Sequence, residues 1–244
     1  MTRHESGTTD AAGPRFVPAD GPGPARGPAG DAGPACGPVG DSVRDPDHLW
    51  PPDDHAWVRP PHRGWVADDL DLLPHLPRKT ELIDGALVLL SPQTVLHERT
   101  TGLLDRALRE QAPEGMKAKR HMTITLDRRN RLDPDVLVVR REALTGPRQV
   151  TFHPGEVLLA VEVTAPDTAG RDREVKPLKY ARAGIPHHWR VEHDDVRPVV
   201  YVHELDPATR AYVPTGVHRD HLRLAVPFGL DIDLGATGRP GRSR

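Results

Sequence analysis

The chain has 244 residues, of which 36% are hydrophobic and 27 are proline, which is enough for one folded domain plus a segment without a core. The formal net charge is −2, with an acidic excess in residues 1–70 and a mildly basic remainder. A basic body fits a polyanion substrate weakly, and an ordinary soluble surface explains the charge equally well. Cys36 is the single cysteine, so an intramolecular disulfide and a multi-cysteine zinc site are excluded.

No apolar run has the length of a membrane-spanning helix, and the first residues lack the apolar stretch of a secretory signal. We therefore expect a cytoplasmic protein with no membrane contact. Residues 1–62 are rich in Pro and Gly and poor in apolar side chains, which predicts a disordered N-terminal tail. A tether or a partner-binding arm is conceivable, but a dispensable extension is the favoured interpretation. Residues 63–236 form the predicted domain, and residues 237–244 form a second disordered tail.

The first half of the predicted domain alternates strands with helices. Four leucines between Leu70 and Leu76 predict a short helix that ends at Pro77. Residues 80–90 predict a hairpin, because Asp84-Gly85 is a good two-residue turn. The apolar stripe of residues 94–111 has helical spacing. Further strands are expected at residues 117–126, 132–139 and 157–164.

The second half of the domain is expected to contain one helix and more strands. The helix is predicted over residues 171–183, with Gly184 as its C-cap and with Pro177 either kinking it or delaying its start. The strands are predicted at residues 187–191, 199–203, 211–213, 222–224 and 230–234. This order favours an α/β or α+β fold in which helices cover the faces of a sheet.

Two predicted strands each carry one carboxylate within an apolar, β-branched run. Asp135 precedes Val136-Leu137-Val138-Val139, and Glu162 lies between Val161 and Val163. A buried carboxylate is costly unless it is paired or binds a cation, so two of them on neighbouring strands indicate a site for Mg²⁺, which prefers oxygen ligands. The alternative is a set of strand-end acids in surface salt bridges. Asp133 points the same way as Asp135 but is expected to be exposed at the strand end.

The helix of residues 171–183 contributes a cationic candidate. Asp172, Lys176 and Tyr180 are spaced by four residues and share one face if the helix is continuous. Lys176 could orient a metal-bound water or stabilise a phosphate, although position alone favours a plain Asp172–Lys176 surface pair. Lys179 lies on another face and is expected to be solvated or to contact phosphate.

Histidine, phosphate-loop and serine-nucleophile motifs give weaker signals. His97 lies near the start of the predicted helix of residues 94–111 and, with Tyr180, is a candidate for substrate contact; an isolated helical histidine is more often structural. The chain contains neither a Gly-rich phosphate loop nor a GxSxG nucleophile motif.

An ordered series of short motifs resembles a known family. The series is Glu81-Leu82-Ile83-Asp84-Gly85, Ser91-Pro92 with His97, Pro134-Asp135-Val136, Val161-Glu162-Val163, Asp172, Lys176, Tyr180, Gly184-Ile185-Pro186 and Trp189. In this order the motifs resemble the Uma-type restriction endonuclease family, a bacterial branch of the PD-(D/E)XK nuclease superfamily, over about residues 65–235.

The resemblance implies a restriction-endonuclease-like core, a mixed central β-sheet flanked by helices, with a nuclease site that depends on Mg²⁺ or Mn²⁺. It places Asp135 and Glu162 at the motif acids and adds Glu81 as a third acid and metal ligand. The superfamily has a lysine two residues after the glutamate, where this chain has Thr164. Lys176 is the candidate substitute, and catalysis depends on it.

Three functions remain open from the sequence. The first is a metal-dependent endonuclease that hydrolyses DNA phosphodiester bonds through Glu81, Asp135, Glu162 and Lys176. The second, motivated by Thr164, is a non-catalytic DNA-binding or assembly protein with the same fold. The third is a metal-dependent hydrolase of a small phosphoester. A homodimer is conceivable because cutting both DNA strands usually needs two sites, but no residue indicates it.

Overall fold

The computed structural model describes residues 59–238. Most of the predicted N-terminal tail and residues 239–244 lie outside this range. Within it, no helix is both long enough and apolar enough to cross a membrane.

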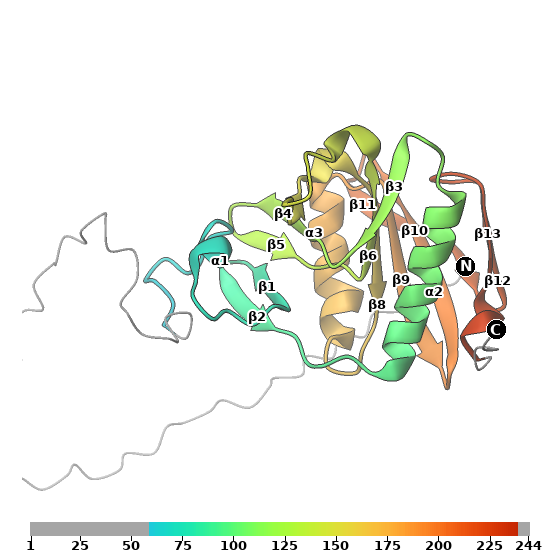
Figure 1. Ribbon diagram of the computed structural model, residues 1–244, viewed down its shortest axis with the longest axis horizontal. Helices are drawn as coiled ribbons and strands as arrows, with labels where there is room; N and C mark the ends of the chain where they lie inside the picture. Colours follow the sequence, from blue (N-terminus) through green and yellow to red (C-terminus); the bar gives the residue numbers. More distant parts are fainter. Residues whose placement is uncertain (1–58, 239–244) are drawn as a thin grey trace, which may run out of the picture. The chain divides into compact units, whose positions relative to one another are not determined.

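A six-stranded mixed sheet forms the centre of the domain (Figure 1). Its strand order is β11-β10-β9-β8-β6-β3, and only β8 and β9 run parallel. The bounds are β3 (Met116–Arg120), β6 (Val136–Arg140), β8 (Val157–Val163), β9 (His187–Asp194), β10 (Arg197–Asp206) and β11 (Ala211–His218). The predicted mixed central sheet is confirmed.

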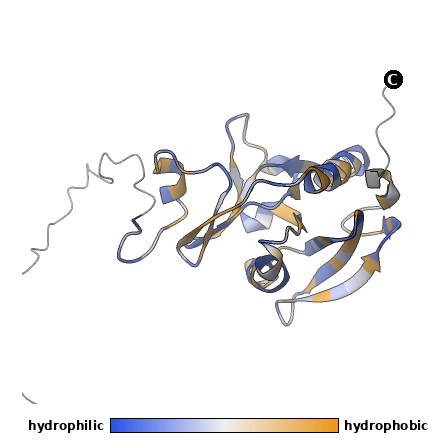
Figure 2. Cartoon of the chain, turned by 90° about the horizontal axis from the view of Figure 1, so that it is seen from below, coloured by the Kyte–Doolittle hydropathy of each residue, from blue (hydrophilic) through white to orange (hydrophobic). Residues whose placement is uncertain are grey.

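Helices cover both faces of this sheet, as Figure 1 shows for α2 (Val95–Gln111) and α3 (Lys176–Ala183). Alternation along β8 explains the two layers, because successive side chains point to opposite faces. Val161 and Val163 pack in the core that contains α2 residues, whereas Ala160 packs in the core that contains Tyr180 of α3. Glu162 therefore faces α3. Figure 2 shows hydrophobic and hydrophilic residues alternating along the strands and the long helix.

The predicted starts and ends of the two helices have clear local causes. Thr94 caps α2 by accepting a hydrogen bond from the backbone N–H of His97 at 3.2 Å. Gly184 ends α3 in the left-handed conformation, with φ of 85°. Pro177 is the second residue of α3, and residues 171–175 before it form a π-helical segment (Arg171–Val175). The proline thus delays the start of the α-helix, one of the two outcomes that the sequence predicted.

A second sheet of five strands lies beside the central one, in the order β2-β1-β5-β4-β7. Its bounds are β1 (Thr80–Ile83), β2 (Ala86–Leu89), β4 (Thr123–Asp127), β5 (Asn130–Leu132) and β7 (Thr151–Phe152). The β1–β2 hairpin turns at Asp84 and Gly85, whose φ angles are 52° and 83°, as predicted. The short helix α1 (Asp69–Leu72) is shorter than expected, since the helix stops before Leu73.

Two predicted strands are each divided between the two sheets. The expected strand of residues 132–139 ends in β5 at Leu132 and resumes as β6 at Val136. Pro134 in this connection has no N–H for a strand ladder. The expected strand of residues 117–126 divides at His121, whose φ is 58°. The chain therefore crosses between the sheets at both of these points, and Asp135 lies just before a strand rather than within one.

The last strands, β12 (His221–Leu224) and β13 (Leu230–Asp233), pair only with each other among the described residues. Leu222, Leu230 and Ile232 pack in the core that contains α2. The two strands lie where the sequence predicted strands, and the structure places them on the α2 side of the domain.

Candidate active site

Strand register places the two predicted motif acids opposite each other. Val136 of β6 pairs with Val161 of antiparallel β8, so Asp135, one residue earlier, lies opposite Glu162. Side chains of opposed residues in an antiparallel pair project from the same face and are near neighbours. Asp135 is also fixed by the backbone, because the N–H of Val163 donates to its Oδ2 at 2.8 Å.

Lys176 lies at the centre of a buried cluster of carboxylates. Its Nζ is 2.9 Å from Glu81 Oε1, 3.0 Å from Glu162 Oε2 and 3.2 Å from Asp172 Oδ1. All four side chains are at most 3% exposed. The expected surface pair of Asp172 and Lys176 is therefore wrong, because the second sheet, which carries Glu81, covers this face of the helix. One ammonium faces three carboxylates, an arrangement with excess negative charge.

The elements around Lys176 fix its direction. Lys176 is the first residue of α3, directly after the π-helical turn that carries Asp172, and π-helical turns are rare and often mark functional sites. The hydroxyl of Thr168 donates to Asp172 Oδ2. Asp172, Lys176 and Tyr180 are all buried on one face, as their spacing predicted. The sequence predicted Asp172 as a neighbour of Lys176 but not as a residue of the site. Its i, i+4 spacing to Lys176 was the signal that could have identified it.

Tyr180 orients the Glu162 carboxylate from the other side. Its hydroxyl donates to Glu162 Oε1 at 2.6 Å, while Lys176 donates to Oε2. Both oxygens of this carboxylate are therefore held, and its plane is set by two residues of one helix. Burial raises the pKa of Tyr180 well above its usual value, with the Glu162 charge adding to the effect. Tyr180 is thus a fixed hydrogen-bond donor at neutral pH.

Glu81 links the second sheet to the cluster. Its Oε1 accepts a hydrogen bond from the Asp133 backbone N–H at 3.1 Å in addition to its contact with Lys176. Its Oε2 is buried and has no hydrogen-bond partner among the described residues. A buried oxygen without a donor is costly, and it leaves acceptor capacity for a water or a cation.

Burial and charge shift the protonation equilibria of the site. Burial raises the pKa of Glu162 well above its usual value. The Lys176 charge lowers this pKa, whereas the neighbouring carboxylates raise it further. Burial by itself would lower the pKa of Lys176, but Glu162, Glu81 and Asp172 hold it well above its usual value. Lys176 is therefore an ammonium at every pH at which the site works. Burial raises the pKa of Asp133 to about 6, and this residue is half-buried, not exposed as expected.

His97 contacts the site from α2. Its Nε2 is 3.3 Å from Asp135 Oδ2, and its side chain is buried. Helix α2, which Thr94 caps, thus holds His97 against the Asp135 carboxylate, and the Val163 backbone N–H fixes the same carboxylate. The position favours a role in orienting Asp135.

A small polar cavity lies between these groups. Its volume is about 10 Å³, close to the space one water molecule needs. It is lined by Lys79, Leu90, Gln93, His97, Asp133, Asp135, Glu162, Val163, Thr168, Asp172 and Lys176. Glu81 does not line it but contacts two of its lining residues, Lys176 and Asp133. Lys79 was not among the predicted site residues, since it has no motif around it.

The donor set fits a divalent cation that keeps most of its waters. Among the described residues no group of three or more His, Cys, Asp or Glu side chains is arranged as a ready metal cage, because Glu81, Glu162 and Asp172 converge on an ammonium. Mg²⁺ is commonly held by only one or two carboxylates together with water and substrate phosphates. Asp135 and Glu162, opposed across β6 and β8 and lining one cavity, meet that lower requirement.

Thr164 and Lys179 are two further positions for which the sequence made a prediction. Thr164 lies beyond the end of β8, and its buried hydroxyl has no partner among the described residues; the ammonium beside Glu162 comes from α3 instead. Lys179 contacts Asp84 at 2.8 Å and is only 11% exposed. The expectation of a solvated Lys179 is therefore wrong, since the β1–β2 turn supplies it with a carboxylate, while its contact with phosphate stays a prediction.

Solved structures of similar shape support the fold class. A crystal structure from Anabaena variabilis, described as that of a putative nuclease, has a TM-score of 0.56 and 14% identity, covering 70% of this chain and 96% of that one. The mixed sheet between helices is thus an architecture that this chain shares with that structure. A search of curated proteins found no match.

The chain belongs to the Uma2 family, which is described as "Putative restriction endonuclease" and matches residues 66–235. This confirms the resemblance that the ordered motifs indicated.

Proposed function

We propose that this protein is a divalent-metal-dependent endonuclease that hydrolyses DNA phosphodiester bonds at the cavity between Asp135 and Glu162. The observation that carries the proposal is the opposition of these two carboxylates across β6 and β8, with the Lys176 ammonium 3.0 Å from Glu162. Membership of the Uma2 family supports DNA as the substrate.

Each side chain has a role that its contacts support. Asp135 and Glu162 would hold Mg²⁺ or Mn²⁺, and such an ion polarises a phosphate and lowers the pKa of a bound water. Lys176 remains protonated, so it stabilises negative charge on the phosphate and does not act as a base. Glu81 and Asp172 position Lys176 through contacts of 2.9 and 3.2 Å.

Two residues predicted to contact substrate have positioning roles in this proposal. Tyr180 fixes the Glu162 carboxylate through its 2.6 Å hydrogen bond, and His97 fixes Asp135. Because the described residues of one chain form one such site, cutting both strands of a duplex would need two copies, and we expect a homodimer on that substrate.

Cleavage of plasmid and oligonucleotide DNA with Mg²⁺ or Mn²⁺ tests the proposal. Asp135→Asn and Glu162→Gln should lose activity at least a hundredfold. Glu142→Gln, an exposed acid in the 3₁₀ turn Arg141–Ala143, is the matched control and should cleave as the wild type does. Equal activity in all four proteins would refute the proposal.

The other two functions are distinguishable outcomes of the same experiment. Salt-sensitive DNA binding without cleavage by the wild type would identify a non-catalytic DNA-binding protein. Turnover of a model phosphoester without turnover of DNA would identify a hydrolase of small phosphoesters.

A further inference from the structure

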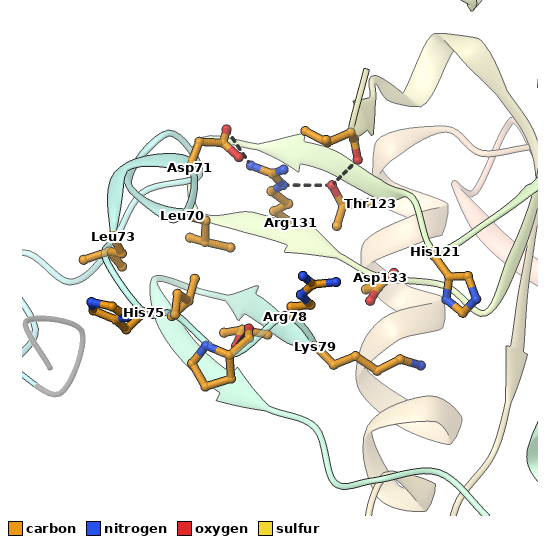
Figure 3. Close-up of a pocket in the computed structure, with 14 residues that line it drawn as sticks. Leu70, Asp71, Leu73, His75, Arg78, Lys79, His121, Thr123, Arg131 and Asp133 are labelled. Atoms are coloured by element: carbon orange, nitrogen blue, oxygen red, sulfur yellow. Dashed lines mark hydrogen bonds and ion pairs between the residues drawn. The ribbon is translucent and has the colours of Figure 1, made fainter. Parts of the chain in front are cut away.

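A second, larger cavity adjoins the carboxylate cavity (Figure 3). Its volume is about 720 Å³, within the range of roughly 300–1,000 Å³ that pockets for small organic ligands occupy. Lys79 and Asp133 line both cavities. A DNA strand whose phosphate lies at Asp135 and Glu162 would therefore extend its next nucleotide into this second cavity, which we call the Lys79 pocket.

Positive charge gathers where the two cavities meet. Arg78, Lys79 and His121 line the Lys79 pocket, and Figure 3 shows Lys79 and His121 on the side of Asp133. Within residues 59–238, the Arg78 and Lys79 side chains have neither an ion pair nor a hydrogen bond. Burial, and then the charges of Arg120 and Lys79, lower the pKa of His121, so the positive charge here comes from the arginine and lysine side chains. Cations that make no ion pair or hydrogen bond within the described residues suit the phosphates of a polyanion.

The far part of the pocket has a different chemistry. Its walls carry apolar carbon from Leu70, Leu73, Leu76, Pro77 and Val150. One wall also holds rigid polar atoms, because buried Arg131 donates to Asp71 Oδ2 at 2.8 Å and to Thr123 Oγ1 at 2.9 Å (Figure 3). Binding of a DNA duplex through its phosphate backbone would require only the cations of the pocket. An apolar slot with fixed polar atoms suits the faces and edges of a nucleobase that has left its stack.

We propose that the Lys79 pocket binds one unstacked nucleotide next to the phosphate that is cleaved, with its base between the apolar walls and its phosphate at Arg78 and Lys79. This inference rests on the proposed nuclease function and assigns to it a preference for single-stranded or locally unpaired DNA. A duplex held only by its backbone is the alternative that the experiment must separate.

Binding of a labelled single strand to the full chain, measured by fluorescence anisotropy with Ca²⁺ in place of Mg²⁺, tests the pocket. Abasic sites are placed at each position in turn. Loss of the base at one position should weaken binding about tenfold, the usual scale of base stacking on a protein. An equal Kd at every abasic position would overturn the proposal and indicate a groove that holds phosphates only.

Variants locate the effect in the pocket. Leu76→Trp fills the pocket from its half-buried wall, so an abasic site should no longer weaken binding of the strand. Val150→Trp should have the same effect, at a position that is 55% exposed and needs no repacking. Leu72→Trp, at a neighbouring leucine that is 57% exposed and outside the pocket lining, is the matched control and should keep the penalty. A penalty that persists in both pocket variants would refute the assignment.

The charge contribution has its own control. Lys79→Ala should weaken binding of every strand about tenfold and reduce its salt dependence, whereas Arg148→Ala, an exposed arginine outside the pocket, should not. Because these measurements record binding, they remain informative if the wild type cleaves nothing, which would instead refute the nuclease proposal.

Discussion

Replacing Lys176 by Met should destabilise the protein strongly, because it removes the cation that contacts three buried carboxylates. Lys176 contacts Glu81, Glu162 and Asp172 at 2.9–3.2 Å, and these side chains are at most 3% exposed. Removing one partner of a buried ion pair costs about 3–5 kcal/mol. For a domain of this size that corresponds to a fall in Tm of about 6–20 °C.

The loss should depend on pH with a defined sign. The pKa of Lys176 is raised in the folded state, so its contribution is fully present below the ordinary lysine pKa and disappears only above it. In the variant, the repulsion among the carboxylates can be relieved by protonation, and burial already raises the pKa of Glu162 above its usual value. The difference between wild type and variant should therefore be larger at pH 8 than at pH 5.

Urea unfolding and thermal unfolding followed by circular dichroism measure both effects. Lys179→Met is the matched control on the same helix, because Lys179 pairs with Asp84, whose side chain is 74% exposed; a pair of this kind is worth under about 1 kcal/mol. A loss for Lys176→Met no greater than that of Lys179→Met, or one independent of pH, would refute the account of the cluster.

Three further predictions follow from the protonation and backbone geometry of the described residues. Asp133→Asn should stabilise the protein by about 1–2 kcal/mol at pH 7.5, a gain that shrinks toward pH 4, because the folded pKa of about 6 exceeds the unfolded value of 3.8; urea titrations at both pH values check it, and an equal gain at both contradicts it. Mn²⁺ affinity measured by calorimetry should rise with pH, since Glu162 must lose a proton to bind, and a pH-independent affinity would remove Glu162 from the metal site. Gly184→Ala should cost about 1 kcal/mol in unfolding free energy, because φ is 85° there while a Cβ would meet nothing within 4 Å; an unchanged free energy would contradict this reasoning.

Local chemistry made several elements predictable. The apolar stripe after Thr94 predicted the bounds of α2, and the Asp84-Gly85 pair predicted the β1–β2 hairpin, because each signal depends on residues that are close together in the sequence. Isolated carboxylates in apolar runs likewise identified Asp135 and Glu162 as residues to be brought together. Whether they serve as metal ligands stays a prediction.

Other features depend on contacts between distant segments. The division of the run around Pro134 between two sheets follows from which strands pair with each half, and periodicity within the run cannot show it. The burial of Asp172 and Lys176 depends on Glu81, which lies about a hundred residues earlier and reaches them only through the second sheet. The Lys79 pocket is similarly assembled from segments that no motif connects.

The family, the helices and the pairing of the two acids could be predicted from short stretches of sequence, because capping, turn chemistry and strand alternation act over a few residues. That Lys176 supplies the ammonium beside Glu162, in a chain with Thr164 two residues after that acid, became visible in the packed fold. The reason is geometric: a lysine side chain can reach one point from a strand or from a helix, and only the packing of α3 on β8 shows which route this chain takes.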